Sequence, residues 1–134
     1  MPNCPAIQPG VAEPALQVPR LSLIIPCYNE ARRIPETLPR LAAYLDTLAA
    51  RGITHEVLLV VERSPDDTLA IARQIAASHP DWRAIDNQVH RGKGCAVRSG
   101  MLRAQGDFAC YMDADLSTAP AAIAEALALL EKNP

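Results

Sequence analysis

Two carboxylates at the end of an apolar segment are the residues of this sequence best suited to chemistry. The segment from Met112 to Ser117 reads M-D-A-D-L-S and places Asp113 and Asp115 two residues apart. Such a pair can share a hard divalent cation through oxygen ligands, while diphosphate oxygens take the remaining positions of the metal. Ser117 could add a hydroxyl ligand or orient a coordinated water. Alternatively, the two aspartates only end a strand and cap the next helix.

A second cluster, H-R-G-K-G from His90 to Gly94, has the composition of an anion-binding turn. Gly92 and Gly94 let the backbone approach a ligand, and the start of a helix offers unpaired N–H groups to an anion. Lys93 would then lie near a phosphate. The Walker pattern G-x-x-x-x-G-K-[ST] is absent, and a flexible turn with a solvated lysine explains the cluster equally well in isolation.

Two further turns offer groups suited to a nucleoside. In the turn P-C-Y-N-E from Pro26 to Glu30, Tyr28 supplies an aromatic surface and Glu30 an acceptor for a base or ribose. Glu62 ends another apolar segment, where it is either an acceptor for a base or ribose donor or an exposed strand-terminal acid. The first turn has no glycine, which counts against a dinucleotide fold, because that fold needs G-x-G-x-x-G there.

Four short apolar segments alternate with four stretches of helical periodicity, which together must position these turns. Strands are expected at Leu21–Cys27, Glu56–Val61, Trp82–Ile85 and Asp107–Met112. This alternation predicts an α/β fold, a Rossmann-like parallel sheet with right-handed crossovers and helices on both faces. In such sheets ligands bind outside the carboxyl ends of the strands, where all the turns described above lie.

Each expected helix has apolar residues at spacings of three or four. The first carries Ile34 to Leu48 and the third runs from Lys93 to about Ala104. For the second helix, Ser64 is expected to be the N-cap, followed by a first-turn proline and two carboxylates that the helix dipole favours. Thr118 is expected to cap the fourth helix.

Composition limits the classes of function. At 134 residues the chain fits one domain or part of a larger one, and its first 20 residues, with five prolines, are expected to form a flexible leader. A net charge of −2 gives no basic field for nucleic acid. The four cysteines form no C-x-x-C pair and the leader has no signal-peptide pattern, which favours free thiols and a cytoplasmic location.

Taken together, the turns resemble the family-2 glycosyltransferases of the GT-A fold, in order and in approximate spacing. P-C-Y-N-E resembles the P-x-Y-N-E turn of that family, and E-V-L-L-V-V-E-R-S-P-D-D-T resembles its E-I-I-V-V-D-D-G-S-x-D-G-T. R-G-K-G-C-A-V-R-S-G-M and M-D-A-D-L-S are closer still. The resemblance covers Leu21 to about Glu131 and is nearest to the branch that uses polyprenyl phosphates, with dolichyl-phosphate glucosyltransferases and mannosyltransferases. The implied fold is the nucleotide-sugar-binding half of the GT-A domain, over residues 21–134.

The resemblance implies a role for each turn. It places Pro26, Tyr28 and Glu30 around the nucleoside. It places Asp113, Ala114 and Asp115 against the diphosphate and a Mg²⁺ or Mn²⁺ ion, with Ser117 where some relatives have a further metal ligand.

The sequence departs from the family pattern at the second turn. Val61 and Glu62 replace the usual acidic pair, so that one carboxylate remains, on a longer arm, and Arg63 replaces a glycine or asparagine. Recognition of the base is therefore the part of the resemblance that these residues support least.

By resemblance, the reaction is an inverting transfer of a hexose from UDP-glucose or GDP-mannose to an acceptor, with a polyprenyl phosphate expected. Such an acceptor is largely ionised near pH 7, because phosphate monoesters have a second pKa of about 6, and it needs little help from a general base. None of the residues above is a convincing base. A lipid acceptor implies peripheral contact with the cytoplasmic face of a membrane.

Two other interpretations remain open. The family's catalytic domains continue well past the position of Pro134, so the chain is expected to keep the donor site, to lack most of the acceptor site and to self-associate. It would then be a truncated or non-catalytic nucleotide-sugar-binding module. A haloacid-dehalogenase-type phosphatase also has D-x-D-x-[TV] after a strand, with the first aspartate as nucleophile, and Asp113 to Ser117 is close to that pattern.

Overall fold

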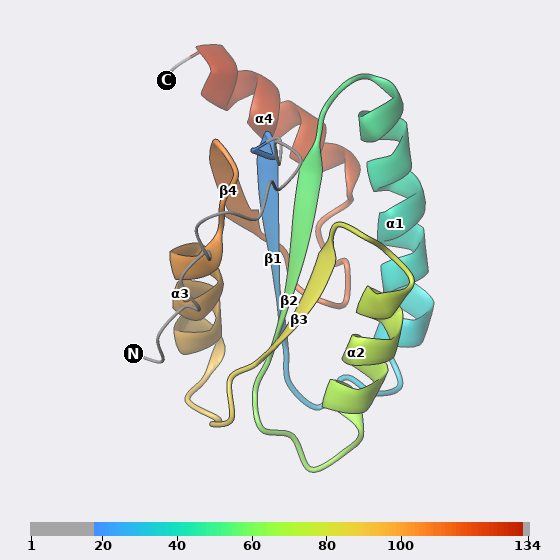
Figure 1. Ribbon diagram of the computed structural model, residues 1–134, viewed down its shortest axis with the longest axis vertical. Helices are drawn as coiled ribbons and strands as arrows, with labels where there is room; N and C mark the ends of the chain where they lie inside the picture. The colour runs from blue at the N-terminus through green and yellow to red at the C-terminus, as the bar shows by residue number, and fades with distance from the viewer. Residues whose placement is uncertain (1–17, 133–134) are drawn as a thin grey trace, which may run out of the picture.

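The computed structural model describes residues 18–132, which form one parallel four-stranded sheet with the strand order β3-β2-β1-β4 (Figure 1). The strands are β1 (Leu21–Cys27), β2 (His55–Val61), β3 (Trp82–Asp86) and β4 (Phe108–Tyr111). The helices are α1 (Ile34–Ala50), α2 (Thr68–Ala77), α3 (Lys93–Arg103) and α4 (Ala121–Lys132). The predicted α/β alternation is therefore confirmed, whereas most of the proline-rich leader lies outside the described residues.

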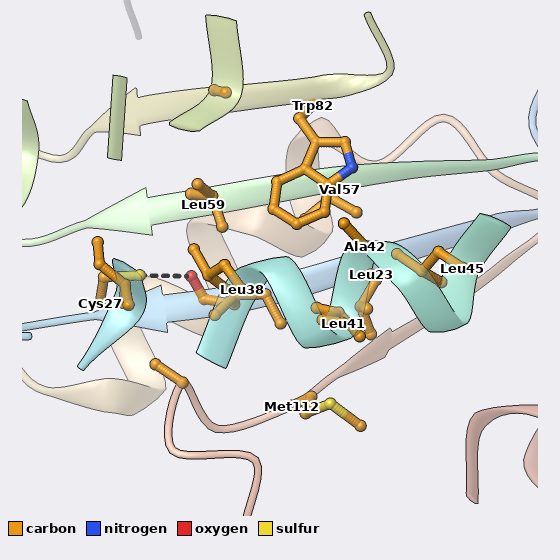
Figure 2. Close-up of a cluster of buried hydrophobic side chains, with 14 of the residues drawn as sticks. Leu23, Cys27, Leu38, Leu41, Ala42, Leu45, Val57, Leu59, Trp82 and Met112 are labelled. Carbon is orange, nitrogen blue, oxygen red and sulfur yellow. Dashed lines mark hydrogen bonds between the residues drawn. The ribbon is translucent and has the colours of Figure 1, made fainter. Parts of the chain in front are cut away.

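The two central strands are buried on both faces. Alternate residues of β1 and β2, such as Leu23 and Leu59, join the larger core beneath α1, α2 and α4, where Figure 2 shows them with Leu38, Leu41 and Trp82. The other residues face α3 and form a smaller core, whose buried members are Ile24, Leu58, Val60 and Ala96. Strands covered on both sides account for the continuous apolar runs of the sequence.

Close packing of α3 on the sheet depends on its glycine. A Cβ atom at Gly100 would lie 2.5 Å from Cγ2 of Ile24, which is closer than real Cβ contacts, and 3.1 Å from Cγ2 of Val60, which is a tight contact. Gly100 therefore lets the helix axis approach β1 and β2. Because α3 follows the carboxyl end of β3, its N-terminus lies at the carboxyl edge of the sheet, beside the turns that the sequence singles out.

Both predicted helix caps are wrong. The helix α2 begins at Thr68, and its N-cap residue is Asp67, whose side chain makes no capping bond. The Ser64 hydroxyl instead donates to the Glu62 carbonyl and accepts the N–H of Asn29. The helix α4 begins at Ala121, so Pro120 rather than Thr118 directly precedes it.

Candidate functional site

The turns after β1, β2, β3 and β4 surround one cavity of about 310 Å³ at the carboxyl edge of the sheet. It is lined by Pro26, Cys27, Tyr28, Glu30, Glu62, His90, Gly92, Lys93, Asp113, Ala114 and Asp115. All nine residues expected to bind substrate are in this set. Ser117 does not line the cavity, and Cys27 and His90 are additional. The parallel topology explains the convergence, because it gathers the carboxyl ends of all strands at one edge.

A buried alanine orients the Asp113–Asp115 turn. Ala114 is 3% exposed and belongs to the larger core, so the aspartates on either side of it project towards the cavity. Asp115 Oδ1 accepts the N–H of Ser117 at 2.9 Å, and this bond lowers the pKa of the Asp115 carboxyl. Leu116 has φ 52°, a left-handed conformation that closes the turn.

Lys93 reaches across the cavity to this turn. Its Nζ atom donates to Asp113 Oδ1 at 3.1 Å, and this hydrogen bond raises the pKa of the Lys93 ammonium. Both side chains are about half exposed, so the pair remains accessible to a ligand. Lys93 is also the first residue of α3, where the backbone N–H groups lack helical partners. The predicted lysine and the predicted carboxylates therefore share one site.

The donor set suits a hard cation held jointly with a ligand. Across residues 18–132, no group of three or more His, Cys, Asp or Glu side chains is placed to hold a metal. Asp113 and Asp115 would supply two carboxylates, which is the number with which proteins commonly hold Mg²⁺ when phosphate oxygens complete its coordination. These two residues fit such an ion. Ser117 as a metal ligand stays a prediction. It does not line the cavity, and its backbone N–H donates to Asp115 Oδ1.

The carboxyl of Glu30 lies near the negatively charged side chains of Asp113 and Asp115. Burial raises the pKa of its carboxyl, the nearby Arg33 opposes the rise, and the charges of Asp115, Asp66 and Asp113 add to it. Arg33 Nη1 lies 3.5 Å from Glu30 Oε2. The site thus has surplus negative charge at its aspartate end, which a divalent cation would offset.

Side chains of the second turn hold the backbone of the first. The N–H groups of residues 29, 30 and 31 donate, in that order, to Ser64 Oγ at 3.0 Å, Thr68 Oγ1 at 2.9 Å and Asp66 Oδ2 at 3.1 Å. The other oxygen of Asp66 accepts from the N–H and the hydroxyl of Thr68. Three consecutive backbone N–H groups of the turn that carries Tyr28 and Glu30 are thereby held. The sequence shows the S-x-D-x-T spacing but not its partners.

Glu62 is not the exposed strand-terminal acid of the alternative interpretation. Its side chain is 3% exposed, and Oε2 accepts the N–H groups of Arg91 at 2.6 Å and Gly92 at 3.0 Å. Its Oε1 atom lies 3.5 Å from His90 Nδ1. The carboxylate at the end of β2 therefore binds the turn that leads into α3.

His90, which was not among the predicted site residues, stacks on Tyr28. The ring centroids are 3.8 Å apart and the planes are inclined by 6°. The stack joins the first turn to the third across the cavity. The only signal in the sequence was the position of His90 beside the glycines of H-R-G-K-G, because the stacking partner is 62 residues away.

Comparison with known proteins identifies the class to which this fold and site belong. The sequence profile of glycosyl transferase family 2 matches residues 22–134, so the chain belongs to that family. This confirms the assignment made from the four turns and sets aside the phosphatase interpretation.

Individual relatives agree with this family. A dolichyl-phosphate beta-glucosyltransferase of Drosophila melanogaster is 38% identical over 102 residues, covering 73% of this chain and 31% of the relative. One from Trichomonas vaginalis is 34% identical over 99 residues, covering 72% and 29%. The chain thus spans about a third of the length of these curated relatives.

A solved structure gives the same fold. The mannosyltransferase PcManGT from Pyrobaculum calidifontis, in complex with GDP-Man and Mn²⁺, superposes with a TM-score of 0.61 at 32% identity. The match covers 72% of this chain and 28% of that one. The GT-A fold expected from the sequence is therefore confirmed. Within the described residues, no helix has the length and apolar character needed to cross a bilayer.

Proposed function

We propose that the chain forms the donor-binding part of a glycosyltransferase that moves a hexose from a nucleoside-diphosphate sugar to a polyprenyl phosphate. The observation that carries the proposal is the convergence of the four turns on one cavity of about 310 Å³. Two comparisons support it: the relatives from Drosophila melanogaster and Trichomonas vaginalis are dolichyl-phosphate glucosyltransferases, and the structure of PcManGT contains GDP-Man and Mn²⁺. We place UDP-glucose slightly ahead of GDP-mannose as donor.

In this proposal, each part of the donor meets a different side of the cavity. The nucleoside lies against the Pro26–Glu30 turn and the stacked rings of Tyr28 and His90, whose outer faces provide a stacking surface. The diphosphate lies between the N-terminus of α3 and Asp113–Asp115, where Lys93 offsets part of its charge. Asp113 and Asp115 would hold a Mg²⁺ or Mn²⁺ ion, which supplies Lewis-acid stabilisation of the leaving diphosphate when bound.

The proposed reaction is an inverting displacement at the anomeric carbon. An oxygen of the acceptor forms the new bond as the bond to the nucleoside diphosphate breaks. A polyprenyl phosphate arrives ionised, so no side chain of this chain has to remove a proton. The described residues accordingly need to bind, orient and neutralise the donor. Peripheral contact with the cytoplasmic face of a membrane, and self-association of the chain, stay predictions.

A second candidate is a module that binds nucleotide sugar without transferring it. It is consistent with the described residues of the cavity, whose proposed roles all concern the donor. Titration calorimetry with UDP-glucose and GDP-mannose, in Mg²⁺ and in Mn²⁺, tests what both candidates share. Absence of binding under all four conditions would refute the donor site. A transfer assay with radiolabelled donor and polyprenyl phosphate then separates the candidates, since only the first predicts labelled lipid.

A further inference from the structure

We infer that Glu62 is a positioning residue for the diphosphate half of the site, and that it makes no contact with the nucleobase. This inference rests on the proposed function and deepens it. Its starting point is the burial of the carboxylate, which is 3% exposed although the residue follows the last residue of β2 at the edge of the cavity. A carboxylate so placed has to be satisfied by the protein itself.

Both oxygens of Glu62 face the turn before α3, and Oε2 makes the hydrogen bonds. Oε2 takes two backbone N–H groups, of Arg91 and Gly92, at 2.6 and 3.0 Å, and Oε1 faces His90 Nδ1 at 3.5 Å. Contact with the imide N–H of a uracil or guanine would require a side-chain oxygen exposed to the cavity. Because the side chain is 3% exposed, exposing such an oxygen requires Glu62 to turn away from the N–H groups that offset its burial.

These bonds determine the conformation of the turn before α3. Gly92 has φ 97°, a left-handed conformation, and α3 begins at the next residue. Glu62 therefore holds the backbone N–H groups of the two residues that immediately precede Lys93, the residue whose ammonium reaches Asp113. The same carboxylate lies beside His90 and supports its stack on Tyr28. Loss of these bonds should displace the N–H groups and the lysine that face the diphosphate.

A base-free ligand distinguishes positioning from base contact. We would measure the affinity of wild-type protein and of Glu62 variants for UDP, for GDP and for inorganic pyrophosphate, each with Mn²⁺. If Glu62 positions the turn, a disruptive variant weakens all three by a similar factor. If Glu62 contacts the base, the same variant weakens UDP and GDP while pyrophosphate binds as before.

Two conservative variants give opposite rankings under the two interpretations. Glu62→Gln keeps the length of the side chain and one oxygen that can accept both N–H bonds, so we expect a loss of no more than about threefold. Glu62→Asp keeps the charge but shortens the arm by one methylene, and we expect a loss of about tenfold or more. Direct contact predicts the reverse, because the family usually has acidic residues at this turn and aspartate would restore that pattern.

Glu56→Ala is the matched control for a disruptive Glu62→Ala variant. Glu56 is also a buried carboxylate of β2, 8% exposed and bonded to a neighbouring loop, but it lies at the opposite end of the strand. It should lower thermal stability and leave pyrophosphate affinity within about twofold. If either alanine variant does not fold, the Gln and Asp variants still decide the ranking.

The stack supplies a readout that a loss of stability alone would not change. His90 lies flat on Tyr28, so its ring protons should show an upfield ring-current shift in the NMR spectrum. We expect this shift in Glu62→Gln and its loss in Glu62→Asp at temperatures where both variants are folded. Failure of wild-type protein to bind any of the three ligands would refute the proposed function. Wild-type binding combined with the reversed ranking, or with unaltered pyrophosphate affinity in Glu62→Asp, would overturn the inference alone.

Discussion

Each end of β2 has a buried glutamate that accepts a hydrogen bond from the backbone of a neighbouring loop. The two ends differ in what lies beyond that loop. At the amino end, Glu56 Oε1 accepts from the Ser22 hydroxyl at 2.6 Å and the Gln105 N–H at 2.7 Å, and Gly106 N–H donates to Ser22 Oγ. At the carboxyl end, Glu62 accepts from Arg91 and Gly92. Each buried carboxylate fastens a loop that adjoins α3.

The difference lies in the packing beyond the fastened loop. A Cβ atom at Gly106 would meet Ser22 Oγ at 2.7 Å and Ser22 N at 2.8 Å, so the loop at the amino end packs directly against β1. At Gly94, in the first turn of α3, a Cβ atom would have no neighbour within 4 Å. A buried carboxylate is therefore no indicator of a binding site by itself. The open space beside the loop and the charged groups around it distinguish the carboxyl end.

Substitution of a glycine by alanine should have the most different effects on stability at the two ends. We expect Gly106→Ala to lower the free energy of unfolding by about 2–4 kcal/mol, because its Cβ would collide with backbone atoms. Gly94→Ala should change stability by at most about 1 kcal/mol, in the stabilising direction, since alanine favours helix. Urea denaturation measures both.

Donor affinity should fall in Gly94→Ala and stay unchanged in Gly106→Ala, the reverse of the order expected for loss of stability. Gly94→Ala places a methyl group where the backbone is proposed to approach the diphosphate, whereas folded Gly106→Ala should bind as wild type does. Equal loss of affinity in both variants would show that the ends are not functionally distinct.

Removal of one carboxylate from the cavity tests the proposed metal site. We expect Asp115→Asn to weaken Mn²⁺-dependent binding of a nucleotide sugar by about tenfold or more, because it removes a charged oxygen ligand. Glu125→Gln is the matched control, since it removes the same charge from an exposed position on α4. Calorimetry with and without Mn²⁺ measures the effect. Similar losses in the two variants would mean that D-A-D has a structural role only.

The hydrogen bonds that hold the N–H groups of residues 29–31 should contribute less to binding than the proposed metal ligand Asp115. Asp66→Ala removes the acceptor of the Ala31 N–H and of Thr68, and we expect UDP affinity to fall about fivefold as Tyr28 and Glu30 lose their fixed positions. Asp67→Ala is the control, because Asp67 is the N-cap of α2 and makes no side-chain capping bond. If Asp67→Ala were as impaired as Asp66→Ala, the hydrogen bonds of Asp66 would not be the cause of the lost affinity.

Local patterns predicted most of the fold but few of the contacts that shape the site. The apolar segments located β1 and β2 to within a residue, because strands buried on both faces leave a continuous hydrophobic signal. Ser64 and Asp66 have the composition of a helix cap, yet their oxygens bond to a turn 35 residues away. Glu62 likewise finds its partners 29 and 30 residues on. Such long-range competition for a polar side chain leaves no trace in local sequence.

The smallest expected effect concerns Cys27, which lies at the carboxyl end of the sheet but should be inaccessible to thiol reagents. It lines the cavity, yet it is 1% exposed, and burial raises the pKa of its thiol to about 12. The thiolate is the reactive form, so at pH 8 Cys27 should be essentially unreactive towards iodoacetamide while the protein is folded. Cys95, half-buried in the first turn of α3, should be alkylated first, and peptide mass spectrometry distinguishes the two sites. Addition of urea should expose Cys27 and lower its pKa towards the usual value of about 8.5, so that it then reacts. Alkylation of Cys27 in the folded protein at a rate matching that of Cys95 would show that the floor of the cavity opens. The description of Cys27 as a buried, inaccessible residue beneath the open carboxyl end would then be wrong.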